Sequence, residues 1–209
     1  MPEKATDKTL SFKSSNKEIA TVDNNGKVTG VASGNATITV MAEDTKTVTA
    51  VIKIKVNKPT VKYTTYVQKT GWTKTVADGA FSGTKGLGYR LEGIKISLGS
   101  IVGTIQYRTY IQKQGWEKTW AKNGSFSGTK GLGYRLEAIQ IKLSGTAAQK
   151  LDVYYRCYAQ KFGWLGWAKN GAAAGTAGYG YRLEGICIKL INKGGAAPGS
   201  TANAYRKNK

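Results

Sequence analysis

One block of sequence occurs three times in this chain, and no other feature restricts the possible folds as much. Each copy holds the stretch Tyr-x-x-Tyr-x-Gln-Lys-x-Gly-Trp, then a Gly-rich loop, then Tyr-Arg-Leu-Glu and an aliphatic run. The stretch ends at Trp72, Trp116 and Trp164, so the repeat period is 44 and then 48 residues. A unit of this size cannot bury a hydrophobic face by itself. We therefore expect the three copies to pack around a common centre.

The aliphatic run of each copy alternates as a half-buried strand does. The face expected in the core is formed by Ile94, Ile96 and Leu98, by Ile139, Ile141 and Leu143, and by Ile186, Ile188 and Leu190. We predict an all-β domain with pseudo-threefold symmetry. A β-prism is favoured because we count three or four strands per unit, and a β-trefoil is the alternative.

The first 58 residues have a different pattern, in which short β-branched runs are separated by turn residues. Asn24-Asn25-Gly26, between the runs 19–22 and 27–31, predicts a β-hairpin. Further strands are expected at residues 36–40 and 48–56. These runs predict part of a β-sandwich.

These patterns divide the chain into three regions. We expect a partial sandwich domain at residues 1–58 and the repeats at 59–193, with copies at about 61–100, 105–145 and 153–191. Residues 194–209 are rich in Gly, Ala, Asn and Lys. We predict that this tail is disordered.

The positive charge is concentrated in the repeats. Residues 59–209 hold 23 basic and 6 acidic residues, a net charge of +17, whereas residues 1–58 hold 9 basic and 6 acidic residues, a net charge of +3. Such a field favours an anionic partner, which could be an acidic cell-wall polymer, a membrane surface or nucleic acid. Nucleic acid ranks last because no nucleic-acid-binding motif accompanies the charge.

The composition argues against catalysis and against a bound cofactor or metal. The chain has no His and only two Cys, so neither a Ser-His-Asp constellation nor a zinc site based on Cys can be built. Each repeat offers essentially one carboxylate, whereas glycosidases need two at a set separation. We expect that the protein is not an enzyme.

The sequence predicts neither a membrane span nor an export signal within this chain. No apolar run approaches the roughly 20 residues that a membrane span needs. Met1 is followed by Pro2-Glu3-Lys4 and not by the apolar segment of a signal peptide.

The candidate ligand-binding residues are the aromatic and polar side chains that recur in the repeats. For the first Trp of each copy, core packing and a stacking platform both stay open. The second Trp, at Trp120 and Trp167, is expected nearer to a surface site, and Val76 takes its place in copy one. The full candidate set is Trp72, Trp116, Trp120, Trp164, Trp167, Gln68, Gln112, Gln160, Tyr89, Tyr134, Tyr181, Arg90, Arg135 and Arg182.

One Glu of each repeat falls in the same register as the core Ile residues. These are Glu92, Glu137 and Glu184, each preceded by an Arg two positions earlier. A buried carboxylate without a partner costs several kcal/mol or becomes protonated. We expect a structural Arg–Glu pair, and the alternative is that these groups line a pocket with the Gln residues.

Both cysteines lie in the third copy, on its first and last strands. Cys157 and Cys187 are therefore a candidate disulfide, with two free buried thiols as the alternative.

The N-terminal region resembles a group 2 bacterial immunoglobulin-like domain. The resemblance rests on Ile19-Ala20-Thr21-Val22-Asp23, Gly26-Lys27-Val28-Thr29-Gly30 and Gly34-Asn35-Ala36-Thr37-Ile38. Such a sandwich needs roughly seven strands, and about five are expected here. We infer that the opening strands of the domain are absent.

The repeats resemble the clostridial hydrophobic repeat with a conserved Trp, the ChW repeat. The resemblance rests on Gln-Lys-x-Gly-Trp, the second Trp, Asn-Gly and Tyr-Arg-Leu-Glu-Gly/Ala-Ile. It implies a secreted or surface-displayed protein of a Gram-positive bacterium that acts in adhesion or in carbohydrate and cell-wall binding. The expected function is a non-catalytic binding module for a polysaccharide or cell-wall glycan, and the alternative is adhesion to a host or assembly protein.

Overall fold

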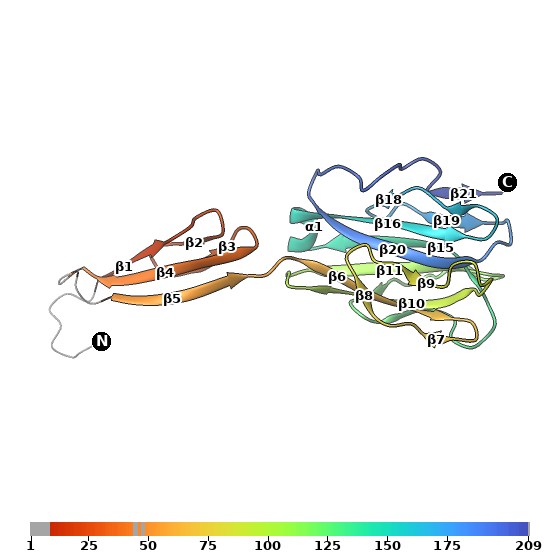
Figure 1. Cartoon of the computed structure of the whole chain (residues 1–209), viewed down its shortest axis with the longest axis horizontal. Coiled ribbons are helices and arrows are strands. Elements are labelled where there is room, and N and C mark those ends of the chain that lie inside the picture. Colours follow the sequence, from red (N-terminus) through yellow and green to blue (C-terminus); the bar gives the residue numbers. More distant parts are fainter. Residues whose placement is uncertain (1–8, 44–45, 47–48, 209) are drawn as a thin grey trace. The chain divides into compact units, whose positions relative to one another are not determined.

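The computed structural model describes residues 9–43, 46 and 49–208, and it divides into two compact units, Met1–Lys58 and Pro59–Lys209. Each unit is described by itself below. Strands dominate both (Figure 1).

The first unit contains a three-stranded antiparallel sheet and a hairpin. The sheet has the order β1-β4-β5. Its strands are β1 (Leu10–Ser14), β4 (Gly34–Ala42) and β5 (Thr49–Val56), and the hairpin strands are β2 (Ala20–Val22) and β3 (Val28–Gly30). The predicted hairpin is confirmed: the Asp23 carboxylate accepts hydrogen bonds from the Asn25 and Lys27 N–H groups, and Gly26 takes a positive φ of 78°.

The edge strand β5 leaves apolar side chains open on both faces of its sheet. Ile52, which pairs with the buried Ile38, is 49 % exposed, and Val51, on the opposite face, is 62 % exposed. The described strands of this unit are all antiparallel, as in the Ig-like sandwich that the sequence predicts.

Each repeat of the second unit contributes the same five strands. Repeat one has β6 (Thr60–Val67), β7 (Gly71–Trp72), β8 (Val76–Ala77), β9 (Ser82–Gly83) and β10 (Leu91–Gly99). Repeat two has β11 (Thr104–Ile111), β12 (Gly115–Trp116), β13 (Ala121–Lys122), β14 (Phe126–Gly128) and β15 (Leu136–Ser144). Repeat three has β16 (Leu151–Ala159), β17 (Gly163–Trp164), β18 (Ala168–Lys169), β19 (Ala174–Ala177) and β20 (Leu183–Asn192), and it is preceded by the short helix α1 (Thr146–Lys150).

The three repeats exchange one strand each, in a ring. The long strands of a repeat pair with each other, but its fourth strand pairs with the last strand of the preceding repeat: β14 with β10, β19 with β15, and β9 with β20. The third pairing joins repeat one to repeat three and closes the ring. Three separate sheets result, none of them closed into a barrel, which is the arrangement of the predicted prism.

The centre of this unit is built from the predicted aliphatic face and three tyrosines. The first two Ile residues of each run are buried, and the Leu that ends it is partly buried against them. Tyr63, Tyr107 and Tyr155 are at most 1 % exposed. Burial raises the pKa of all three phenols.

Each central Tyr ties two repeats together by the same pair of hydrogen bonds. The Tyr107 hydroxyl accepts the Ile96 N–H at 2.9 Å and donates to the Ser125 carbonyl. The equivalent bonds join Ile141, Tyr155 and Ala172, and Ile188, Tyr63 and Ala80. The buried hydroxyls thus have both donor and acceptor partners, as buried polar groups require.

The C-terminal segment is ordered, which corrects the prediction of a disordered tail. Its strand β21 (Tyr205–Lys207) pairs in parallel with β19. Asp152 fixes its beginning: the carboxylate forms ion pairs with Lys169 and Lys193 and accepts the Gly194 N–H at 2.9 Å. The composition of the tail gave no sign of these tertiary contacts.

Candidate functional site

A β-bulge positions the recurring Arg and Glu of each repeat. The pairing of β10 with β6 shifts register between Leu91 and Gly93, and the same shift occurs in the other two repeats. Because of the bulge, Leu91 joins the core while Glu92 turns toward Arg90. The expected register of the Glu with the Ile face is therefore wrong, since a bulge lies between them.

The predicted Arg–Glu pairs are confirmed. Their N···O distances are 2.8 Å for Arg90–Glu92, 2.8 Å for Arg135–Glu137 and 2.9 Å for Arg182–Glu184. The Glu side chains are 5–6 % exposed and the Arg side chains 23–26 %. Each pair thus presents one partly accessible guanidinium held by a buried carboxylate.

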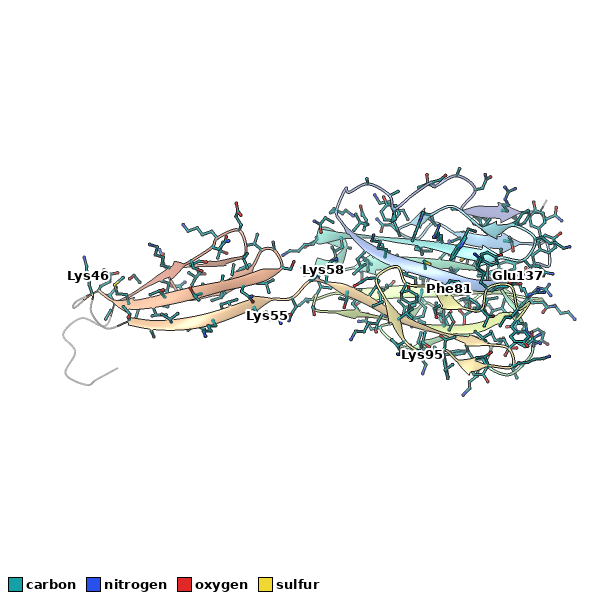
Figure 2. All side chains as sticks on the ribbon, in the orientation of Figure 1. Lys46, Lys55, Lys58, Phe81, Lys95 and Glu137 are labelled. Atoms are coloured by element: carbon teal, nitrogen blue, oxygen red, sulfur yellow. The ribbon has the colours of Figure 1, made fainter. Side chains whose placement is uncertain are left out.

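The Gly-rich loop of the next repeat crosses each pair, so every candidate site belongs to two repeats. We call these places junction 1–2 (Arg90 and Glu92 with residues 129–133), junction 2–3 (Arg135 and Glu137 with residues 176–180) and junction 3–1 (Arg182 and Glu184 with residues 84–88). The Thr129 N–H bonds the Glu92 carbonyl at 2.7 Å, and the Thr84 N–H bonds the Glu184 carbonyl at 2.8 Å. Figure 2 labels Glu137, at the end of the repeats where β21 lies in Figure 1.

Junction 3–1 contains a pocket of ≈ 330 Å³. Its lining includes Tyr158, Gln160, Lys161, Arg182 and Glu184, together with Gly86 and Gly88 of the loop. The alternative from the sequence, in which Arg, Glu and Gln line a pocket together, therefore describes this junction. The Gln160 N–H also bonds the Arg182 carbonyl at 2.9 Å, and Gln68 and Gln112 make the equivalent backbone bond.

The first Trp of each repeat is half-buried, and its neighbours occupy its edges and faces. Each packs edge-on against a Tyr, with centroid distances of 5.4–5.5 Å. Trp72 also meets Phe126 of repeat two, and Trp164 meets Phe81 of repeat one. These Trp residues are therefore neither fully core nor free platforms.

In repeats two and three an Arg stacks on both Trp rings. The Arg108 guanidinium lies 5.3 and 4.9 Å from the ring centroids of Trp116 and Trp120. Arg156 lies 4.2 and 4.9 Å from those of Trp164 and Trp167. In repeat one Thr64 replaces this Arg, and Lys95 lies over Trp72 instead.

The structure corrects the placement of the second Trp in two ways. Trp167 is only 7 % exposed, because the C-terminal segment lies against it at Gly199, and the Ser200 carbonyl accepts the backbone N–H of Trp167. In repeat one the second Trp is replaced by Thr75 and not by Val76. Val76 pairs with Tyr63 as Ala121 pairs with Tyr107 and Ala168 with Tyr155.

The remaining candidates are partly buried aromatics beside the junctions. Tyr89 and Tyr134 pack against the core, and Tyr181 stacks on Tyr179 at 5.7 Å. Sequence reasoning missed Tyr158 and the Gly loop as partners of the Arg–Glu pair. Tyr158 reaches the pair through the pairing of β16 with β20 inside repeat three, and the Gly loop reaches it through the exchange of β9 between repeats.

The two cysteines are free thiols, so the disulfide candidate is wrong. Cys157 pairs with Ile186 on β20, and its side chain is in the core cluster. Cys187 follows Ile186 and therefore points to the opposite face of the sheet. Burial raises the pKa of both thiols.

Neither a metal cluster nor a membrane-spanning helix is found in residues 9–43, 46 and 49–208. No three His, Cys, Asp or Glu side chains of these residues lie together as metal ligands would. Within the same residues, no helix has the length and apolar character needed to cross a bilayer.

The comparisons with known proteins identify the class of module. The chain matches the family Clostridial hydrophobic W (ChW) over residues 66–100, 110–145 and 158–192, and it matches Bacterial Ig-like domain (group 2) over residues 1–52. The chain therefore belongs to the ChW repeat family and carries three copies of the repeat behind an Ig-like domain. Such domains are typical of bacterial surface proteins. No curated protein and no solved structure matches the chain.

Proposed function

We propose that this bacterial surface-associated module binds an anionic polysaccharide or cell-wall polymer without acting on it. The observation that carries the proposal is that all six carboxylates of the repeat unit are used internally. They pair with Arg or Lys or accept backbone and hydroxyl hydrogen bonds, at Asp78, Glu92, Glu117, Glu137, Asp152 and Glu184. The basic residues that give residues 59–209 a net charge of +17 therefore face few free carboxylates on the surface of the unit, and this favours a polyanion.

The aromatic and polar groups at the junctions support a sugar as the repeating unit. Sugars offer apolar ring faces and hydroxyl groups, and binding sites for them combine aromatic side chains with a few fixed polar groups. Tyr158, Gln160 and Arg182 meet at junction 3–1 in this way. A non-catalytic role is supported by the Arg partner of each junction Glu, which occupies the carboxylate that a hydrolase would need as acid or base.

Co-sedimentation of the full chain with insoluble polygalacturonate, with cross-linked dextran as the neutral control, tests the proposal. We expect binding to polygalacturonate that weakens steadily as salt rises to roughly 0.5 M, because salt screens exposed charges. Equal binding to both polymers, or no effect of salt, would contradict the proposal. Failure on polygalacturonate and on isolated Gram-positive wall fractions would contradict it as well.

A second candidate function is adhesion to a host or assembly protein. Leu87 and Leu132, at the tips of two Gly-rich loops, are 63 % and 68 % exposed. Apolar side chains on a polar rim are suited to contact with another protein. If a purified surface protein binds and the double variant Leu87→Ser, Leu132→Ser abolishes this binding while polyanions have no effect, protein adhesion replaces glycan binding.

A further inference from the structure

The three junctions have the same origin but differ in how open they are. At junction 1–2 the loop closes on the acid: the Gly131 N–H donates to Glu92 Oε2 at 3.0 Å, while Oε1 is bonded by Arg90. Lys130 of that loop lies over the Tyr66 ring at 5.6 Å. Both carboxylate oxygens at this junction therefore have protein partners.

At junction 2–3 the loop and the C-terminal segment occupy the equivalent space. Tyr179 stands where the other loops have Leu, and it packs on Phe162 and Tyr181. The main chain at Asn208 lies 3.3 Å from where a Cβ on Gly178 would be. This junction is covered by side chains and by the segment that contains β21.

At junction 3–1 the acid is left with a free acceptor. Arg182 bonds Glu184 Oε1. In the part of the chain that the structure describes, no N–H or O–H group donates to Glu184 Oε2, although the side chain is only 6 % exposed and lines the pocket. This oxygen is not one of the buried atoms that lack a hydrogen-bond partner in the described residues, so it reaches the solvent of the pocket and can accept a hydrogen bond from a ligand hydroxyl.

The other groups of the pocket fit an anionic substituent. Lys161 and Arg182 line it, and Lys85 of the loop lies over the Tyr158 ring at 5.5 Å. These three cations outnumber the one carboxylate, which is already paired. Gly86 and Gly88 bring backbone to the pocket without side chains, and this permits close approach of a ligand.

We propose that junction 3–1 is the subsite for one acidic sugar residue, so that the threefold module has one such subsite and not three. This inference rests on the proposed function. A sugar hydroxyl donates to Glu184 Oε2, in the place that the Gly131 N–H takes at junction 1–2. Arg182, Lys161 and Lys85 hold the acidic group, and Gln160 can donate to or accept from a further hydroxyl.

Amide chemical-shift mapping of the full chain with trigalacturonate tests the subsite, with maltotriose as the neutral sugar and glycerol phosphate as an anion without a sugar ring. We expect saturable shifts at Gly86, Gly88, Gln160 and Lys161 with trigalacturonate, and binding at least about tenfold weaker for the other two probes, because each lacks one class of contact. Equal shifts at all three junctions, or none, would overturn the assignment. Tight binding of glycerol phosphate would overturn the assignment of a sugar as the ligand and would show a site for anions in general.

A matched pair of variants separates this inference from the proposed function. Gly86→Asn adds a side chain at the loop of junction 3–1, and Gly131→Asn adds it at junction 1–2. A Cβ has open space at both, and their φ values of 78° and 73° are alike. Asn is among the residues that best tolerate this region. We expect Gly86→Asn to weaken trigalacturonate binding about tenfold or more and Gly131→Asn to change it less than about twofold.

The double variant Gln160→Ala, Lys161→Ala at junction 3–1 and the equivalent Gln112→Ala, Lys113→Ala at junction 2–3 give a second comparison without added bulk. If wild-type protein binds polygalacturonate and neither junction 3–1 variant alters trigalacturonate binding, the subsite is wrong and the proposed function stands. If wild-type protein binds neither polygalacturonate nor trigalacturonate, the subsite and the proposed function are both wrong.

Discussion

The layer that faces the axis of the repeat unit and the rim that carries the junctions arose from the same three copies, yet only the axial layer has kept its symmetry. Around the axis, each Tyr makes the same two hydrogen bonds to the same two neighbours. On the rim, one junction is closed by a backbone donor, one is covered by the C-terminal segment and one is open. Mutual burial restricts the axial residues, whereas the rim residues are free to differ from one repeat to the next.

The largest effect should come from the axial layer. Ile141→Ala removes a fully buried side chain where three repeats meet, and we expect a loss of about 3–4 kcal/mol in the free energy of unfolding. Urea unfolding followed by Trp fluorescence measures it, because all five Trp residues lie in the repeat unit. Leu132→Ala on the rim is the control, with an expected change under about 0.5 kcal/mol. Equal losses would show that the two layers do not differ in this way.

The axial hydrogen bonds can be tested without making a cavity. Tyr155→Phe keeps the ring but leaves the Ile141 N–H and the Ala172 carbonyl without their partner. We expect a loss of about 2–3 kcal/mol, because unsatisfied buried groups lose their hydration as well as their bond. Tyr158→Phe on the rim should be close to neutral by the same urea assay. If Tyr155→Phe leaves the free energy of unfolding unchanged, the hydrogen bonds of the central tyrosines do not explain the symmetry of the axial layer.

The Phe that packs against the neighbouring repeat and the Gly that faces it vary together, which predicts that substitutions at the two positions compensate each other. A Cβ on Gly185 would lie 2.0 Å from the Phe81 ring, and one on Gly93 would lie 2.2 Å from Phe126. Where the third repeat has Ala173 in place of this Phe, the facing residue is Ala138.

Gly185→Ala alone should therefore cost about 2 kcal/mol through overpacking. Adding Phe81→Ala should recover part of this loss, so that the double variant is at least about 1 kcal/mol more stable than the sum of the single changes predicts. Thermal unfolding of the four proteins completes the cycle. Strict additivity would mean that the Gly and the Phe are not coupled.

The smallest effect concerns Asp152, which only the third repeat carries. Burial alone would raise its pKa, but bonds from Lys169, Asn170, Gly194 and Lys193 outweigh burial and hold the pKa below its ordinary value. A lowered folded-state pKa gives stability that is present above the unfolded pKa of about 3.9 and is lost as the pH falls through the folded value.

We expect Asp152→Asn to cost about 1–2 kcal/mol at neutral pH, and the difference from wild type to shrink as the pH falls below about 4. Hydrogen exchange at the amides of residues 194–207 provides a second readout, because Asp152 fixes the start of that segment. If the exchange rates do not change, Asp152 does not order this segment.

The sequence was sufficient for whatever depends on periodicity within one repeat. Alternation located the aliphatic face, and the two-residue spacing of Arg182 and Glu184 located the ion pair. The hairpin around Asn25 followed from its turn residues. These features depend on neighbours in the chain, which the sequence displays directly.

The rest depends on contacts between residues far apart in the chain. The pocket needs Gly86 and Arg182 together, and only the pairing of β9 with β20 brings them there. The bulge at Glu184 shifts a register that alternation alone cannot reveal. No local pattern in the sequence predicts that residues 198–202 cover Trp167.

Closure of the ring through β9 and β20 also limits how such an array can grow. A linear solenoid leaves an open end on which a further repeat can stack. Here the last strand of repeat three already pairs with the short strand of repeat one. The short strand of a fourth copy added to this chain would therefore have no free partner, and its core face would have no place at the axis. Valency in this architecture therefore increases by adding whole three-repeat bodies, each with its own closed ring.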